Sequence, residues 1–378
     1  MDNFWRASGR DAMELTVLSI AYPFEAVRPD MGGGPGQVLG MLDVALKKRG
    51  YRSIVVPGGG ARVEGTVLEI PVLDKWGKGR VTLESRTFVR SAVEEILQRE
   101  PVDVIHVHDL DYVSCVFGAG PPVLATLHLP LDSYDAGTFR PRPHVYYNCV
   151  SAHQERSARH VPNLFPFVEY GVPVDELGVS VPRQDFVLAL GPICPAKAVH
   201  LAVDAAAQAD VPVLVAGTLL PYRSHHDYYL RKFAPLFNGT NRKFLGPVTF
   251  ETKRRLLASA KCLLVPSQVP ETSSLVTMEA YACGTPVIAS PSGALVDLVE
   301  HGKTGFLANT VDEMCEAIGR IDDIDREHCK YVARTRFSLD RMVDDYLALY
   351  ETIINIYRAD LTLSSDMEET RPTGTMAD

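Results

Sequence analysis

The chain has 378 residues, which is more than one hydrophobic core usually organises, so we expect two domains. A formal net charge of -9 without a long Lys/Arg run argues against nucleic acid as a partner, and seven scattered cysteines with no CxxC pair argue against a disulfide framework or a zinc knuckle. The N-terminus has no apolar core of signal-peptide length and no apolar run is long enough for a membrane helix, so we expect a cytoplasmic protein.

The first half of the chain alternates short β-branched runs with helical patterns. We predict strands at 15–22, 53–57 and 102–109 and helices at 36–49 and 88–98. This alternation is typical of βαβ units with a parallel sheet. We therefore expect an N-terminal Rossmann-like domain over residues 13–178.

The same rhythm restarts in the second half. It predicts a C-terminal Rossmann-like domain over 183–338, with strands at 185–191, 211–217, 261–267 and 285–290 and helices at 197–208 and after 274. The fold class is thus α/β with two doubly wound parallel-sheet domains facing a cleft. Residues 339–357 have the spacing of a long amphipathic helix, which we expect to pack back on the N-terminal domain, and residues 364–378 read as a disordered tail.

A glycine-rich turn follows the first predicted strand. Its glycines, Gly32, Gly33, Gly34 and Gly36, could let the backbone approach a phosphate at the start of the next helix. Open parallel sheets bind ligands at such strand-to-helix loops. The other reading is an ordinary turn, because the sequence matches neither GxxxxGK[ST] nor a clean GxGxxG.

The segment ETSSLVTMEAYACGTPVIAS at 271–290 carries two carboxylates. A loop holds Glu271, and a helix beginning near Ser274 ends at a glycine stop, Gly284, with Glu279 two turns along. Small polar residues at the helix start leave its amides open to an anionic ligand. The two carboxylates can then hold hydroxyl groups on either side of a diphosphate. The other reading makes Glu271 a cap and Glu279 a solvated helix residue.

Residues 266–307 resemble the E-x7-E, G-x-P-V and G-x-x-G-F signatures of retaining glycosyltransferases of family 4, which have the GT-B architecture. Supporting pieces are Gly33-Gly34 ahead of LDVALKKRGY, VDVIHVHD, VLATLHLP, EYGVPVD and FLGPVTFETKRRLLASAKCLLVPS. The resemblance runs from about Leu15 to Tyr357 and says little about the substrate.

The resemblance implies a reaction and a set of site residues. A sugar moves with retention from a nucleotide diphosphate sugar, expected to be a UDP-sugar, to an unidentified small-molecule, glycan or lipid-linked hydroxyl acceptor, without a metal or other cofactor. Glu271 would bind the donor sugar and Glu279 the ribose, while His128 would lie near the transferred sugar. The diphosphate would be held by Lys197, by Gly33 and Gly34, and by amides near Ser273, Ser274, Leu275 and Val276.

One position departs from the family pattern G-R-x-x-x-x-K. Pro192 stands where the arginine is expected, which removes a bidentate phosphate donor. Either Arg28, Arg223 or Arg242 substitutes for it, or the protein binds nucleotide sugars with weak or lost transfer.

His106, His108 and Asp109 end a predicted strand, and His-x-His can bind a metal. No convincing set of further ligands accompanies them, so we expect no metal. These histidines are expected either to line the acceptor side of the cleft or to have a purely structural role. A group of basic residues could contact an anionic membrane if the acceptor were a lipid, but we favour the interpretation that they form a solvated face. The group comprises Lys75, Lys78, Arg80, Arg86 and Arg90.

Overall fold

The structure is a computed structural model of the whole chain. It describes residues 15–22, 26–30, 34–57, 61–67, 83–108, 116, 120–135 and 137–369. The predictions made for Gly33, Asp109, Lys75, Lys78 and Arg80 lie outside these ranges.

The N-terminal domain is built on a seven-stranded parallel sheet with the order β3-β2-β1-β4-β5-β6-β7. Its strands are β1 (Thr16–Ile20), β2 (Arg52–Val56), β3 (Thr66–Val67), β4 (Val104–Val107), β5 (Val123–Leu127), β6 (Val145–Cys149) and β7 (Leu164–Phe165). Its helical segments are α1 (Pro35–Lys48), α2 (Leu83–Arg99), η3 (Leu131–Ser133) and α3 (Ala152–Ser157). β1 pairs with β2 from Thr16 opposite Arg52 to Ile20 opposite Val56.

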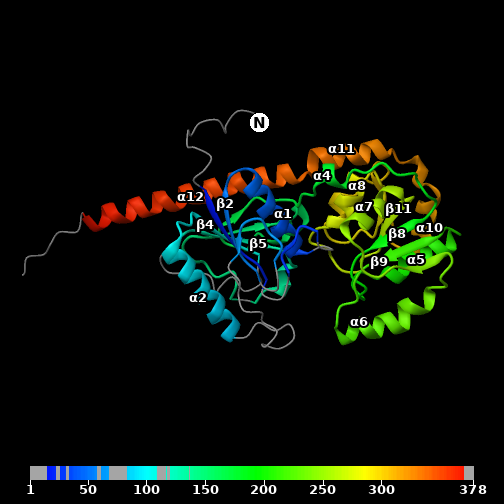
Figure 1. Cartoon of the computed structure of the whole chain (residues 1–378), viewed down its shortest axis with the longest axis horizontal. Helices are drawn as coiled ribbons and strands as arrows, with labels where there is room; N and C mark the ends of the chain where they lie inside the picture. The colour runs from blue at the N-terminus through cyan, green and yellow to red at the C-terminus, as the bar shows by residue number, and fades with distance from the viewer. Residues whose placement is uncertain are drawn as a thin grey trace, which may run out of the picture.

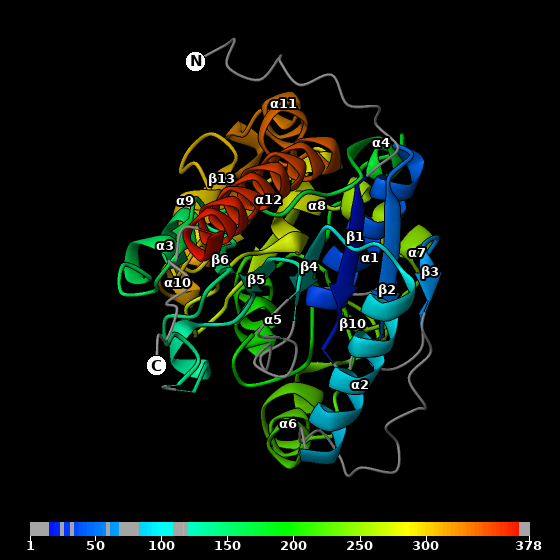
Figure 2. The same cartoon turned by 90° about the vertical axis from the view of Figure 1, so that its left-hand side faces the viewer.

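The central strands of this sheet are buried on both faces, as the continuous β-branched runs predict. Val17 belongs to the core on the side of α1 and α12, while its neighbour Leu18 belongs to the core on the side of α2. Successive side chains of a strand point to opposite faces, so one strand serves both cores. Figure 2 shows α12 and α2 on opposite sides of the sheet.

The C-terminal domain has a six-stranded parallel sheet with the order β10-β9-β8-β11-β12-β13. Its strands are β8 (Val187–Leu190), β9 (Val213–Ala216), β10 (Arg242–Phe244), β11 (Cys262–Val265), β12 (Val287–Ala289) and β13 (Gly305–Leu307). Its helical segments are α4 (Val174–Leu177), α5 (Val199–Gln208), α6 (Arg223–Tyr228), η4 (Tyr229–Phe233), η5 (Ala234–Leu236), α7 (Phe250–Ser259), α8 (Leu275–Ala282), α9 (Leu295–Leu298), α10 (Val311–Gly319), η6 (Ile321–Asp323) and α11 (Arg326–Arg336). The two sheets lie on either side of the domain boundary that the sequence predicts between residues 178 and 183.

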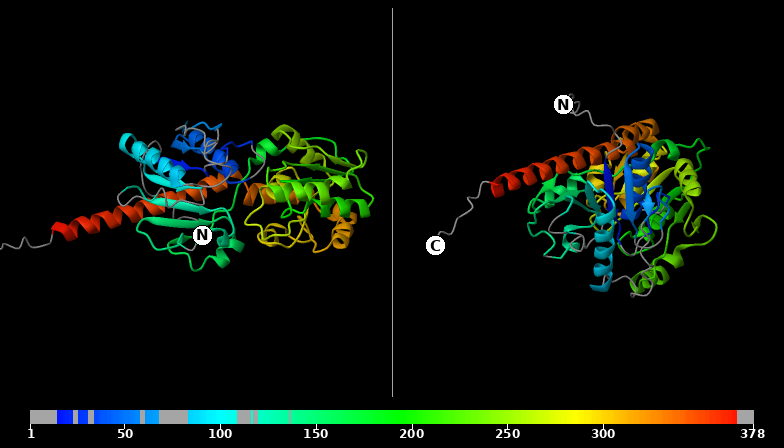
Figure 3. Two further views of the ribbon diagram at one scale, coloured as in Figure 1. Left: turned by 90° about the horizontal axis from the view of Figure 1, so that it is seen from below. Right: turned by 60° about the vertical axis from the view of Figure 1, so that its left-hand side comes forward.

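A last helix, α12 (Leu339–Glu369), leaves the C-terminal domain and runs along the N-terminal domain (Figure 1), and its end projects beyond that domain (Figure 3). It packs against α1, where the guanidinium of Arg49 forms ion pairs with Asp340 and Asp344. The apolar spacing predicted this helix over 339–357. The prediction of a disordered tail from residue 364 is wrong for 364–369, because adding residues to an existing helix costs far less than starting one.

A buried polar layer joins α12 to the N-terminal sheet. His106 Nδ1 lies 2.6 Å from the Tyr350 hydroxyl, and His106 Nε2 lies 2.7 Å from the Thr126 hydroxyl. The Thr126 hydroxyl also donates to Asn148 Oδ1 at 2.7 Å and lies 3.3 Å from the Tyr346 hydroxyl. Buried polar groups need such partners, so this layer fixes the helix on the sheet.

Two helix starts differ from the predicted ones. α2 begins at Leu83, five residues before the predicted start, and α5 begins at Val199, two residues after it. Ala198 has a left-handed conformation with φ 46°, which ends the preceding loop and delays the helix. Lys197 therefore lies in the loop before α5 and not in its first turn.

No helix within the described ranges is both long and apolar enough to cross a membrane. The cysteines in these ranges are all free thiols, namely Cys149, Cys194, Cys262, Cys283, Cys315 and Cys329.

Candidate functional site

Glu271 lies in the loop between β11 and α8, at the carboxyl edge of the C-terminal sheet. Its backbone forms a bridge with Gly293, and its carbonyl accepts a hydrogen bond from the Ala294 amide at 2.7 Å. Gly293 has φ 64°, and a Cβ there would lie 2.3 Å from both the nitrogen and the oxygen of Glu271. Only glycine allows this close approach, so the turn at 293 fixes the position of the carboxylate.

Lys197 and Glu271 meet in an ion pair. β8 and β11 are neighbours in the sheet, so the loops that follow them lie side by side, and the Gln268 amide donates to the Ala196 carbonyl at 2.9 Å. Lys197 Nζ lies 2.6 Å from Glu271 Oε1, with the lysine side chain 37% exposed and the glutamate side chain 10% exposed. The structure thus brings together Lys197, which the family resemblance assigned to the diphosphate of the donor, and Glu271, which it assigned to the donor sugar.

Glu279 lies in the middle of α8 and is only 3% exposed, so its reading as a solvated helix residue is wrong. Its Oε1 accepts hydrogen bonds from Lys253 Nζ in α7 at 2.5 Å and from Gln37 Nε2 in α1 at 3.1 Å. The other oxygen, Oε2, has no hydrogen bond to a residue that the structure describes. Glu279 is therefore held by both domains and keeps one oxygen open.

Sequence reasoning missed both partners of Glu279. Lys253 stands among three consecutive basic residues, and Gln37 follows a glycine-rich turn. Helical spacing gave a signal for each residue, because residues four apart lie on the same face of a helix. Lys253 lies four residues before the buried Leu257, and Gln37 lies four residues before the buried Met41. A polar residue on the apolar face of a helix needs a buried partner.

The start of α8 has polar groups without partners. Ser274 is the N-cap residue, but its side chain does not cap the helix and its hydroxyl lies 2.9 Å from that of Thr277. The buried hydroxyl of Ser273 has no hydrogen-bond partner within the described part of the chain. The amides of Leu275 and Val276 come next, and the first amides of a helix have no partner within it. This is the arrangement that accepts an anion.

The loop that carries Glu271 also contacts the other domain. The Thr272 hydroxyl donates to the backbone carbonyl of His128 at 2.8 Å. The His128 ring is enclosed, with Nε2 2.9 Å from His108 Nδ1 and Nδ1 2.6 Å from the Tyr170 hydroxyl. Burial lowers the pKa of His128 to about 3. His128 thus lies beside the donor loop, but both of its ring nitrogens already have partners.

The described residues contain no group of three or more His, Cys, Asp or Glu side chains arranged to hold a metal.

Arg28, one candidate to replace the missing arginine, lies 3.5 Å from Asp30. Arg223 begins α6 and Arg242 begins the edge strand β10. Among the described residues, none of these three arginines forms an ion pair with Glu271 or Glu279. Gly34 precedes α1 with φ 93°.

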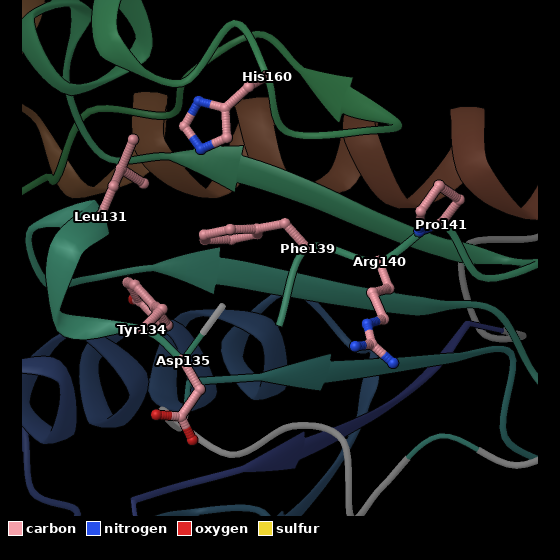
Figure 4. Close-up of a pocket in the computed structure, with 7 residues that line it drawn as sticks. All are labelled: Leu131, Tyr134, Asp135, Phe139, Arg140, Pro141 and His160. Atoms are coloured by element: carbon pink, nitrogen blue, oxygen red, sulfur yellow. The ribbon is translucent and has the colours of Figure 1, made fainter. Parts of the chain in front are cut away.

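A surface hollow is lined by the loop between β5 and β6 and by His160, which follows α3. Figure 4 shows the Phe139 ring between Tyr134 and His160, with ring centroids 5.6 and 5.8 Å away. The lining residues are Leu131, Tyr134, Asp135, Phe139, Arg140, Pro141 and His160. None of them belongs to the predicted donor site.

Comparisons with known proteins find similar sequences and similar folds. Residues 184–322 match the family model of glycosyl transferases group 1. The D-inositol 3-phosphate glycosyltransferase of Mycolicibacterium smegmatis is 32% identical over 201 residues, covering 50% of this chain and 43% of the relative. The enzyme of the same name from Salinispora tropica is 31% identical over 202 residues, covering 49% of this chain and 42% of the relative. The matched region thus spans less than half the length of these relatives.

Solved structures share the architecture over most of the chain. The sucrose-phosphate synthase of Thermosynechococcus elongatus has a TM-score of 0.71 at 19% identity and covers 90% of this chain and 100% of that chain. AviGT4, a glycosyltransferase involved in avilamycin A biosynthesis, has a TM-score of 0.67 at 20% identity, covering 90% and 98%. HepE of Anabaena in complex with UDP and glucose has a TM-score of 0.68 at 16% identity, covering 89% and 100%. Residues 184–322 are therefore similar to the glycosyl transferases group 1, and the chain has the GT-B fold of two Rossmann-like domains.

Proposed function

We propose that this protein is a retaining, metal-independent glycosyltransferase that moves a sugar from a UDP-sugar to a hydroxyl acceptor. One observation carries the proposal: two lysine–glutamate pairs, Lys197–Glu271 and Lys253–Glu279, occur with the uncapped start of α8 at the carboxyl edge of one sheet. Carboxylates suit the hydroxyls of a sugar and a ribose, and helix amides with a lysine suit the diphosphate between them.

The two pairs have different roles in this proposal. Lys197 is the more exposed partner of its pair, so it can turn from Glu271 to a phosphate and release the carboxylate for sugar hydroxyls. Glu279 stays bound to Lys253 and Gln37 through Oε1 and accepts a ribose hydroxyl with Oε2. Amides of the first turn of α8, at Leu275 and Val276, receive the diphosphate.

The proposed step breaks the bond between the anomeric carbon and the diphosphate oxygen, which leaves with the bonding electrons. The acceptor oxygen forms a bond to the same face of the anomeric carbon, and its proton passes to the leaving diphosphate. Lys197 and the amides stabilise the charge that grows on the leaving group.

Names of similar proteins support the choice of substrates. Relatives that match about half of this chain carry the name D-inositol 3-phosphate glycosyltransferase, so a polyol or its phosphate is the acceptor class we propose. A structural neighbour contains UDP and glucose, in line with a UDP-sugar donor. The free cysteines fit the reducing cytoplasm that we propose as its location.

Pro192 supports a second candidate, a nucleotide-sugar-binding protein with weak or lost transfer. Pro192→Arg separates the two candidates. If no residue has replaced the missing guanidinium, this substitution should raise transfer or diphosphate affinity. If Arg28, Arg223 or Arg242 already fills the place, the substitution should give no gain.

The direct experiment combines binding and turnover. A thermal-shift screen over nucleotide diphosphates and their sugars should select UDP and one UDP-sugar, since a ligand at 100 times its Kd stabilises by ~2.7 kcal/mol. Transfer from the selected donor to D-inositol 3-phosphate and other polyols is then followed by product analysis. Binding without transfer or donor hydrolysis would favour the second candidate, and no stabilisation by any nucleotide would contradict both.

A further inference from the structure

His106 and His108 lie two residues apart at the end of β4, and their side chains therefore share one face of the sheet. Their ring centroids are 3.9 Å apart. His106 has partners on both ring nitrogens, the hydroxyls of Tyr350 and Thr126. These contacts hold α12 on the sheet and explain His106 structurally.

His108 differs because only one of its nitrogens has a partner. Nδ1 lies 2.9 Å from His128 Nε2, whereas Nε2 is buried and has no hydrogen-bond partner among the described residues. The residue is 3% exposed. Leaving a buried polar atom unpaired costs stability, so an unpaired atom in a well-packed region needs another explanation.

The position of His108 explains why its Nε2 is left without a partner. It follows β4 directly, His128 follows the neighbouring strand β5, and open parallel sheets bind ligands at this edge. The carbonyl of His128 accepts the hydrogen bond from Thr272, the residue after Glu271. His128 therefore links His108 to the contact between the N-terminal domain and the loop that carries Glu271.

We propose that His108 Nε2 binds a hydroxyl group of the acceptor. This inference rests on the proposed function and deepens it, because it assigns an acceptor-binding residue on the N-terminal domain. His128, which the sequence pointed to, has no free ring nitrogen and acts as a positioning residue for His108.

The chain Tyr170–His128–His108 explains why the ligand group is a hydroxyl. If the Tyr170 hydroxyl donates to His128 Nδ1, then His128 Nε2 donates to His108 Nδ1, and His108 Nε2 carries a proton to donate. If Tyr170 accepts, every bond reverses and His108 Nε2 becomes an acceptor. A hydroxyl can partner the nitrogen in either case, since it both donates and accepts.

The same surroundings exclude a role for His108 as a base. Burial, together with the neighbouring histidines, lowers its pKa well below the ordinary value. The imidazole stays neutral near pH ~7 and orients the hydroxyl, while the acceptor proton passes to the leaving diphosphate.

A pair of substitutions tests the assignment. The amide of glutamine reaches about as far as Nε2 of histidine, and the amide of asparagine about as far as Nδ1. With UDP-glucose and D-inositol 3-phosphate as substrates, His108→Asn should lower kcat/KM for the acceptor at least about tenfold, and His108→Gln should recover part of it. UDP affinity by calorimetry should stay within about twofold in both variants, because the nucleotide is assigned to the other domain. Equal transfer by the two variants, or by His108→Asn and the natural protein, would overturn the inference.

A second measurement separates this inference from the proposed function. In protein labelled with 15N-histidine, saturating D-inositol 3-phosphate or glycerol, each with UDP, should shift the Nε2 resonance of His108 and leave that of His106 unchanged. A shift without any sugar transfer would support His108 and contradict the proposed function. No shift with either compound would overturn the assignment of His108, whatever the activity.

Discussion

Lys253 Nζ lies 2.5 Å from Glu279 Oε1, and both side chains are at least nine-tenths buried. An isolated buried charge is strongly disfavoured, so the lysine and the glutamate each compensate the charge of the other inside the domain. Gln37 adds a hydrogen bond to the same oxygen from the other domain. The carboxylate assigned to the ribose is thus positioned before any nucleotide binds.

Removing Lys253 should therefore destabilise the C-terminal domain. We expect Lys253→Met to lower the free energy of unfolding by about 3–5 kcal/mol, because it leaves an unpaired buried charge. Urea denaturation followed by circular dichroism measures this loss. Lys253→Met combined with Glu279→Met should lose less than the single substitution, since no charge is then left alone.

Arg255→Met provides the matched control on the same helix. Its side chain is 62% exposed and lies 3.5 Å from Glu251, so the change should stay within about 0.5 kcal/mol. If Lys253→Met were as mild as Arg255→Met, Lys253 would not be needed to hold Glu279.

Glu271→Gln should separate sugar binding from nucleotide binding. The substitution keeps the shape of the side chain but loses the charge-assisted hydrogen bonds to sugar hydroxyls. We expect UDP affinity to persist while transfer and donor hydrolysis fall. An equal loss of affinity for UDP and for the UDP-sugar would mean that Glu271 only holds its loop.

Lys197→Ala should slow turnover by a factor of about 10² to 10³, as the loss of one preorganised stabilising group does. Lys303→Ala is the control, because that side chain is 69% exposed and 3.7 Å from Glu300, outside the site. Steady-state kinetics with the donor found by the screen measures both variants. Equal rates for the two would remove Lys197 from the reaction.

Stability should fall as the pH decreases below about 6.5, the ordinary pKa of histidine. Burial lowers the pKa of His128 to about 3 and those of His106 and His108 well below the ordinary value. Below pH ~6.5 the unfolded chain then binds more protons than the folded one, and each histidine lowers the free energy of unfolding by up to about 1.4 kcal/mol per pH unit. Calorimetry should show a lower Tm at pH 5.5 than at pH 7.5. A Tm that is flat over this range would contradict the buried neutral cluster.

The fold was predictable because its signals are local. β-branched runs alternating with helical spacing predict a parallel sheet, and Gly284 after the helix from Ser274 predicts where α8 ends. The sequence also predicted α12, although not its length. From Ser364 onward the sequence lacks the apolar spacing of 339–357, so periodicity alone cannot distinguish a helix that continues from a tail.

The site was predictable only in part, because its contacts join distant segments. The sequence predicted Lys197, Glu271 and Glu279 as site residues, but the ion pair of Lys197 with Glu271 depends on which loops the strand order places together. Gln37 and Glu279 are 242 positions apart, and only packing of the two domains brings them into contact. The free nitrogen of His108 was equally hidden, since His106 and His108 look alike in the sequence and differ only in what packs against them.

In the proposed function, the Glu279 carboxylate binds the ribose of a uridine nucleotide. Titration calorimetry of UDP with the natural protein and with Glu279→Gln tests it, because this variant keeps the shape of the side chain and can still accept from Lys253 and Gln37. We expect UDP to bind the natural protein and the substitution to weaken binding by about 1–3 kcal/mol, the scale of a lost hydrogen bond to a charged group. UDP affinity unchanged in a folded Glu279→Gln variant would contradict it.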